Sequence, residues 1–312
     1  MKKVFLVLMA VLVVPLGCAP GVAPTPTEVA PTPTSTFVQA TPSYSVEITK
    51  DIEYLKLLEP DAPVLTLDIY APTESGPWPV LVVDHGGFQS KDNSMYANFA
   101  EELAGRGVVV FVPDRRTPCA ILRECLADNG RDIREIEETY ECGFRFARER
   151  AADYGGDPSR LTVFGDDSAG LAGAFIGDGL QQAWEEVVSG RGGPPPQTDC
   201  LAVEDSARVD AFMSYGGSYD FYDEAEETDP DLWALASYYG LMGRSPSLVI
   251  RLVHGGLANP EYIENGVALN AALVNAGYDA THTLLGDVKW EIPWSGPYRE
   301  ELIQMTLDLA RG

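Results

Sequence analysis

Short apolar runs alternate with longer amphipathic stretches from about residue 44 to the end of the chain. Two early segments alternate apolar and polar residues, which predicts antiparallel strands at a sheet edge over 45–49 and 64–70. Later runs are continuously apolar. They predict central strands buried on both faces over 80–83, 108–112, 161–164, 209–213, 248–253 and 281–285.

Helical periodicity fills the gaps between these strands. It predicts helices over 96–106, 133–154, 168–180, 262–276 and 297–310. Strands that alternate with helices indicate an α/β fold with a mostly parallel central sheet of about eight strands, flanked by helices. Ligands of such sheets bind at the carboxyl ends of the strands, so the chemistry is expected in the loops that follow them.

The N-terminus departs from this pattern. Lys2 and Lys3 precede an apolar run over 4–14, and a small-residue site follows, which together predict a secretory signal over 1–18. Because Cys18 comes directly after a Gly, the site resembles a bacterial lipoprotein processing site, where this Cys carries lipid. Ordinary signal cleavage nearby is the alternative.

Residues 19–43 are dominated by Pro, Thr, Ala and Val, and they predict an extended linker without a core. Residues 44–312 are then the folded domain. We expect an exported, bacterial-type protein, either a cell-envelope lipoprotein or extracellular, that meets the membrane only through lipid on Cys18.

The chain is strongly acidic, with a formal net charge of −25. It has no basic patch, so the sequence argues against nucleic-acid partners and against binding an anionic membrane surface. The excess of acidic residues favours solubility.

Cysteine usage fits an oxidising compartment. Besides Cys18 the chain has Cys119, Cys125, Cys142 and Cys200, an even number that favours disulfides in an exported protein. Three pairings are possible, and we favour Cys119–Cys125 with Cys142–Cys200. The spacings are not those of a metal site and the chain has 3 His, so neither a metal nor another cofactor is expected.

Two loops at strand ends carry candidate chemistry. His-Gly-Gly at 85–87 follows a buried strand, and its backbone N–H groups can face an oxyanion. Gly-Asp-Asp-Ser-Ala-Gly at 165–170 places Ser168 at a strand-to-helix turn. Ser168 alone would fit a helix N-cap. The two loops together favour a nucleophile beside an oxyanion hole formed by Gly86, Gly87 and Ala169.

These motifs resemble the α/β-hydrolase superfamily, in its esterase/lipase-like branch. The resemblance extends to Tyr-Gly-Gly-Asp-Pro at 154–158, Asp-Arg at 114–115, the turn at 216–220 and Val-His-Gly at 253–255. It covers roughly residues 60–310. It implies the α/β-hydrolase fold, Ser168 as the nucleophile of a carboxylic-ester hydrolase, and a small-molecule ester or acyl ligand.

The strand-to-helix turn at 165–170, called the nucleophile elbow in that family, departs from the family pattern Gly-x-Ser-x-Gly. Asp166 stands two residues before Ser168, where the family has Gly, and Gly165 is one residue further back. Either one residue is inserted, or Asp takes the place of a Gly that is small because strand and helix nearly touch there.

The other two members of the triad are also replaced. Asn259 stands at the expected position of the acid, with Asp220 or Glu261 as possible substitutes. Lys289 stands at the expected position of the His base. His282 lies inside a predicted strand, where a structural role is the better interpretation.

Two hypotheses follow for the function. The first is a serine esterase with impaired activity, because loss of the base from a triad reduces turnover by about 10⁴ to 10⁶. The second is a catalytically inactive pseudo-hydrolase that acts as a binding or scaffold lipoprotein. The sequence leaves the substrate and the oligomeric state open.

Overall fold

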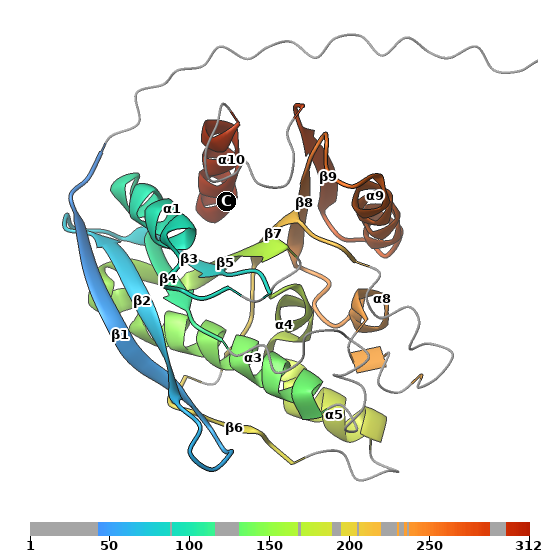
Figure 1. Ribbon diagram of the computed structural model, residues 1–312, viewed down its shortest axis with the longest axis horizontal. Helices are drawn as coiled ribbons and strands as arrows, with labels where there is room; N and C mark the ends of the chain where they lie inside the picture. Colours follow the sequence, from blue (N-terminus) through green and yellow to red (C-terminus); the bar gives the residue numbers. More distant parts are fainter. Residues whose placement is uncertain are drawn as a thin grey trace, which may run out of the picture. The chain divides into compact units, whose positions relative to one another are not determined.

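The computed structural model describes residues 43–87, 89–115, 131–167, 170–188, 195–204, 206–219, 230, 234–235, 237–287 and 298–312. The folded unit is built around one mixed sheet, with strand order β6-β1-β2-β4-β3-β5-β7-β8-β9 (Figure 1). The strands are β1 (Val46–Leu57), β2 (Val64–Pro72), β3 (Trp78–Asp84), β4 (Val109–Pro113), β5 (Gly156–Asp167), β6 (Thr198–Cys200), β7 (Ala211–Gly216), β8 (Val249–Gly255) and β9 (Ala280–Leu285).

The sheet is antiparallel at one side and parallel elsewhere. β1 pairs antiparallel with both β2 and β6, and β2 pairs antiparallel with β4. From β4 through β3, β5, β7 and β8 to β9 every pairing is parallel. All carboxyl ends of the parallel strands therefore lie along one edge of the sheet, where a ligand site is expected.

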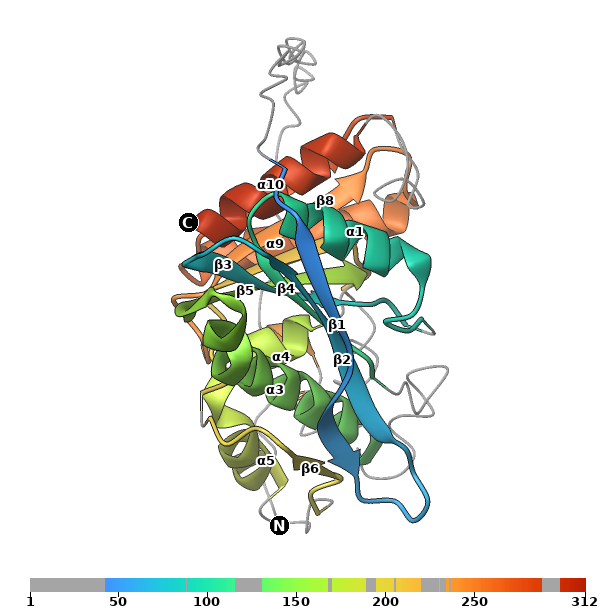
Figure 2. The ribbon, with the colours of Figure 1, turned by 90° about the vertical axis from the view of Figure 1, so that its left-hand side faces the viewer.

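Helices cover both faces of the sheet. They are α1 (Ser94–Gly105), α3 (Arg131–Ala151), α4 (Leu171–Ile176), α5 (Leu180–Val188), α8 (Tyr238–Leu241), α9 (Pro260–Asn275) and α10 (Arg299–Arg311), with 3₁₀ turns η1 (Ala152–Tyr154) and η2 (Gly177–Gly179). α1 and α10 lie on one side of the sheet and α3, α4 and α5 on the other (Figure 2). Residues of α1 and α10 belong to one apolar core, and residues of α3, α4, α5 and α9 belong to the other. No helix in the described part of the chain is both long and apolar enough to cross a bilayer.

The predicted fold class is confirmed, with two local differences. The sheet has nine strands instead of about eight, because β6 is only three residues long and too short to show periodicity. The single helix predicted over 168–180 is instead α4, the turn η2 and then α5. The break comes at Gly177, whose φ of 52° lies outside the helical region.

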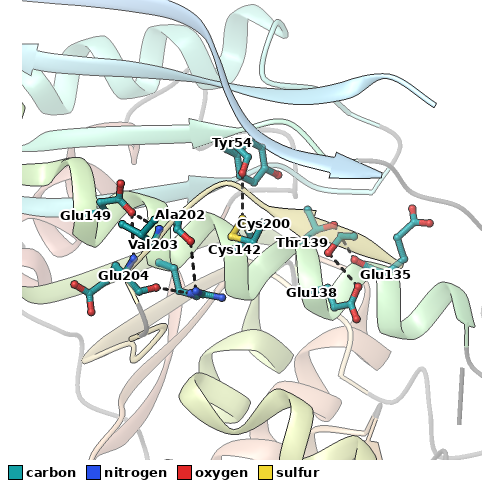
Figure 3. Close-up of a disulfide and its surroundings, with 12 residues drawn as sticks. Tyr54, Glu135, Glu138, Thr139, Cys142, Glu149, Cys200, Ala202, Val203 and Glu204 are labelled. Carbon is teal, nitrogen blue, oxygen red and sulfur yellow. Dashed lines mark hydrogen bonds between the residues drawn. A yellow bond between two sulfur atoms is a disulfide. The ribbon is translucent and has the colours of Figure 1, made fainter. Parts of the chain in front are cut away.

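A disulfide joins Cys142 of α3 to Cys200 of β6 (Figure 3). It is one of the two pairs favoured from the sequence; Cys119 and Cys125 lie outside the described residues. Next to it, the Glu149 carboxylate accepts the backbone N–H groups of Val203 and Glu204 at 2.6 and 3.1 Å. Glu138 of α3 also accepts the Gln197 N–H at 2.8 Å and the Thr198 hydroxyl at 3.0 Å. The disulfide and these hydrogen bonds fix β6 and its flanking residues to α3, in addition to the short pairing of β6 with β1.

We expect removal of this disulfide to lower the free energy of unfolding. The bond closes a loop across a sequence separation of 58 residues, and such cross-links typically contribute about 2–4 kcal/mol. The variant Cys142→Ala/Cys200→Ala should show this loss in urea unfolding under oxidising conditions. Val203→Ala, at a residue 82% exposed in the same segment, is the control and should change stability by less than about 0.5 kcal/mol. An unchanged urea midpoint in the double variant would contradict the expectation.

Candidate active site

The loop after β3 is held tightly from within. His85 is fully buried, and its Nδ1 donates to the carbonyl oxygen of Gly86 at 3.0 Å. The Gly86 N–H donates to the hydroxyl of Tyr96 in α1 at 3.0 Å. Gly87 is exposed, with open space where a side chain would begin. Of the predicted oxyanion donors, Gly86 therefore has its N–H occupied, Gly87 has the open position, and Ala169 lies outside the described residues.

A buried ion pair between Arg115 and Asp84 holds the start of this loop. Arg115, just after β4, donates from Nε to Asp84 Oδ1 at 3.0 Å and from its terminal nitrogen to the carbonyl oxygen of His85 at 2.7 Å. Burial raises the pKa of Asp84, and the adjacent guanidinium counteracts this rise. Because both charged groups are buried, removing Arg115 would take this guanidinium away from the buried Asp84 carboxylate, which is costly. The pair therefore holds the start of the loop.

The far end of the same loop is fixed to the antiparallel strands. The Lys91 side chain is only 3% exposed, and its Nζ lies 2.7 Å from Asp51 Oδ1, 3.1 Å from Asp68 Oδ1 and 3.2 Å from Asp92 Oδ1. Asp51 and Asp68 belong to β1 and β2. The candidate oxyanion loop is thus anchored at both ends by buried charge.

The elbow itself has an unexpected register. Asp167, the last residue of β5, has a φ of 64°, in the left-handed region that residues other than Gly adopt at some cost in energy. It stands two residues after Gly165, the place of Ser in Gly-x-Ser-x-Gly, and the family elbow is strained at that residue. The backbone therefore puts Asp167 at the strained position, which corresponds to the first of the two alternatives offered by the sequence, one residue inserted between Gly165 and Ser168. Ser168 lies outside the described residues.

β7 and the loop that follows it hold Asp167 in this conformation. Its Oδ1 accepts the backbone N–H of Ser218 at 3.1 Å, and its carbonyl oxygen accepts the Ser214 hydroxyl at 2.5 Å. Since Ser214 gives its only hydroxyl proton to Asp167, the buried Tyr219 hydroxyl donates to Ser214, at 2.7 Å. The end of β5 is therefore fixed by its neighbour strand.

Asp166 points to the opposite side of the sheet from these contacts, toward α1. Its side chain is buried, and Oδ2 accepts the Tyr96 hydroxyl at 2.5 Å. Burial raises the pKa of Asp166 to about 6, although the hydrogen bond from Tyr96 lowers it. A carboxylate that is costly to ionise is thus kept directly beside the elbow.

His254 and His282 form a hydrogen bond with each other. His254 Nε2 donates to the Gly217 carbonyl oxygen at 2.8 Å, so in the neutral ring Nδ1 is an acceptor. His282 Nε2 lies 3.0 Å from that Nδ1 and must be the donor. Burial lowers the pKa of His254, and burial followed by the charge of His254 lowers the pKa of His282 to about 4. Both rings are therefore neutral at pH 7, which agrees with the structural role expected of His282.

The expected acid has a different task. Asn259 is exposed at the start of α9, where its Oδ1 accepts the backbone N–H of Glu261 at 3.2 Å as an N-cap. Glu261 is exposed in the first turn of that helix. Asp220 and Lys289 lie outside the described residues. Within the ranges given above, neither His254 nor His282 contacts a carboxylate, and no three His, Cys, Asp or Glu side chains could hold a metal ion.

Comparisons with known proteins connect this architecture to esterases. Neither a protein-family model nor a curated protein matches the chain. Among solved structures, a truncated carbohydrate esterase from gut microbiota is 18% identical with a TM-score of 0.60, covering 88% of this chain and 99% of its own. Esterase B from Lactobacillus rhamnosis is 17% identical with a TM-score of 0.61, covering 85% and 86%. The thermophilic esterase Est2 from Thermogutta terrifontis is 18% identical with a TM-score of 0.54, covering 83% and 92%.

At these identities the likeness shows the fold. The nine-stranded mixed sheet with helices on both faces is an α/β-hydrolase fold of the kind found in esterases.

Titration of Asp166 should appear in the stability of the protein. Its pKa is higher in the folded chain, about 6, than the ordinary 3.8. Ionisation of Asp166 therefore opposes folding. The stability contributed by its protonated form is fully present below pH 3.8 and is lost as the pH rises through 6. The free energy of unfolding of Asp166→Asn minus that of wild type should therefore increase by about 1–3 kcal/mol from pH 4 to pH 8. Urea unfolding at both pH values measures this, and a difference that does not change with pH would refute it.

Proposed function

We propose that this protein is a serine carboxylic-ester hydrolase of the esterase type whose activity is strongly impaired, acting on a small-molecule ester or acyl ligand. The observation that carries the proposal is the pairing of β3 with β5, which sets Asp84 opposite Gly165. The Gly-Gly loop and the elbow start from these two neighbouring strand ends. This is the arrangement in which an esterase joins oxyanion donors to its nucleophile.

In this proposal Ser168 attacks the ester carbonyl and the N–H groups of Gly87 and Ala169 hold the oxyanion. Lys289, at the expected position of the base, takes the Ser proton and returns it to the leaving alcohol. It does so only as the neutral amine, which requires burial. The acid is Asp220 or Asn259, and we propose Asp220 because the Asn259 side chain already caps α9.

Impairment follows from the same features. The strained elbow position is occupied by Asp167, so the serine is displaced by one residue from the place where the fold holds a nucleophile. Neither histidine near the site is suited to act as the base. Both ring nitrogens of His254 are engaged, by His282 and by the Gly217 carbonyl oxygen, and burial lowers the pKa of His282 to about 4, which makes it a weak base at pH 7. The remaining oxyanion donors would retain about 10³–10⁴-fold of the acceleration over water.

The runner-up is a pseudo-hydrolase, a binding or scaffold lipoprotein that keeps the pocket without turnover. The position of Asp167 favours it, because Asp167 occupies the strained place of the nucleophile and its Oδ1 accepts the Ser218 N–H. In both cases we propose export through the N-terminal signal, with lipid on Cys18 as the membrane anchor.

The two functions differ in whether Ser168 reacts. We expect wild type to hydrolyse p-nitrophenyl acetate about 10⁴-fold or more below an intact triad, and a fluorophosphonate to label Ser168 slowly. Ser168→Ala should abolish both signals. Ser159→Ala, at an exposed serine before β5 reaches the core, should leave them unchanged. Turnover that survives in Ser168→Ala, or no adduct on Ser168, would decide against the esterase and for the binding protein.

Deletion of Asp167 tests the register directly. It leaves Gly165-Asp166 followed by Ser168-Ala169-Gly170, so that the serine moves to the strained position. Combined with Lys289→His and Asn259→Asp, this deletion should raise ester hydrolysis at least about 100-fold, part of the factor that an intact triad supplies. The same two substitutions without the deletion are the matched control. Equal rates in both would show that Asp167 does not displace the nucleophile.

A further inference from the structure

One side chain of helix α1 reaches both loops of the site. The Tyr96 hydroxyl accepts the Gly86 N–H at 3.0 Å and donates to Asp166 Oδ2 at 2.5 Å. Gly86 belongs to the loop after β3, and Asp166 is the second-last residue of β5. Tyr96 and Asp166 are each 2% exposed or less. A continuous, water-excluded chain of hydrogen bonds therefore joins the oxyanion loop to the elbow.

The direction of this chain is fixed by chemistry. A backbone N–H can only donate and a tyrosine hydroxyl carries one proton, so Tyr96 must give that proton to Asp166. Without the hydroxyl, an amide and a carboxylate would both be buried without this partner, which is costly for each. The chain therefore holds the two loops at one separation.

Steric fit reinforces the same separation. A Cβ on Gly86 would lie 3.0 Å from Asp166 Oδ2 and 3.6 Å from the Tyr96 hydroxyl. Any residue other than Gly would press against the hydrogen-bond chain and push the loop outward. Gly86 is thus a residue of close approach, and the following Gly87 is the first whose N–H can face a ligand.

We propose that Tyr96 is a positioning residue of the site. Its hydroxyl donates to Asp166 and accepts the Gly86 N–H, which locks the loop at Gly86 in one position and so directs the Gly87 N–H toward the elbow. The role in ester hydrolysis rests on the proposed function. The locking of the loop does not, because it concerns the resting structure of the chain.

The test is Tyr96→Phe, which keeps the ring and removes the hydroxyl. Tyr215→Phe is the matched control, because the Tyr215 hydroxyl is buried in the same core and has no hydrogen-bond partner among the described residues. Hydrogen exchange of the Gly86 amide is read by NMR or by overlapping peptides. We expect exchange at least tenfold faster in Tyr96→Phe and unchanged in Tyr215→Phe, with circular dichroism confirming that both variants fold.

The acceptor is tested by two substitutions at one position. Asp166→Asn keeps an oxygen for the Tyr96 hydroxyl and should retain protection of the Gly86 amide. Asp166→Ala removes the oxygen and should expose the amide as Tyr96→Phe does. For p-nitrophenyl acetate, Tyr96→Phe should lower kcat about tenfold with KM changed less than twofold, since the affected donor acts on the transition state.

The outcomes separate this inference from the proposed function. Unchanged Gly86 exchange in a folded Tyr96→Phe variant, or equal acceleration in Tyr215→Phe, overturns the positioning role. Should wild type show no turnover that depends on Ser168, the ester hydrolase is refuted, while faster Gly86 exchange still supports the lock as part of a binding site. A lower kcat with unchanged exchange would again count against the lock.

Discussion

The parallel pairing of β3 with β5 is the constraint on which the site depends. Both strands are central, and the apolar residues 80–83 of β3 and Leu161, Val163 and Phe164 of β5 are buried, so their register is fixed by packing on both faces of the sheet. With Asp84 opposite Gly165, the loops that follow must start side by side. The chemistry of the site is therefore decided by a few residues just beyond this pairing, and the rest of the sheet serves to hold those residues in place.

Unusually many ionisable groups are buried around these strand ends. Asp84 with Arg115, and Lys91 with Asp68, are ion pairs that lie almost entirely out of water. Asp166 has a hydroxyl as its partner instead of a cation. Buried charges of this kind are weak contributors to net stability but are sensitive to displacement. They are suited to holding loops at fixed positions, which a site with preformed donors requires.

Much of the fold follows from periodicity, because the central strands are continuous apolar runs and the long helices are amphipathic. Three features could not be obtained that way. β6 is three residues long and depends on pairing with Leu55–Leu57 of β1 and on the disulfide, both of which are non-local. Tyr96 is the first residue of the helix predicted over 96–106, and its hydroxyl acquires its role only when α1 brings it to Gly86 and Asp166. Asn259 resembled a triad position by spacing, but local hydrogen bonding to its own helix prevails. The place of Asp167 could be predicted, because counting two residues forward from Gly165 leads from the first Gly of Gly-x-Ser-x-Gly to the position of its Ser. Alignment of the motif on Ser168 hides this register.

The disulfide between Cys142 and Cys200 also makes covalent completion of the fold depend on the redox state of the compartment. Thiols stay reduced in a bacterial cytosol and oxidise outside it. Before oxidation, β6 is held by a three-residue ladder with β1 and by hydrogen bonds from α3, in which Glu138 accepts from Gln197 and Thr198 and Glu149 accepts from Val203 and Glu204. In the proposed export, the covalent tie between this edge and α3 would be added only in an oxidising compartment. For the export proposed above, such a delay would keep the polypeptide easier to unfold for passage through a membrane pore, and formation of the disulfide would follow transport.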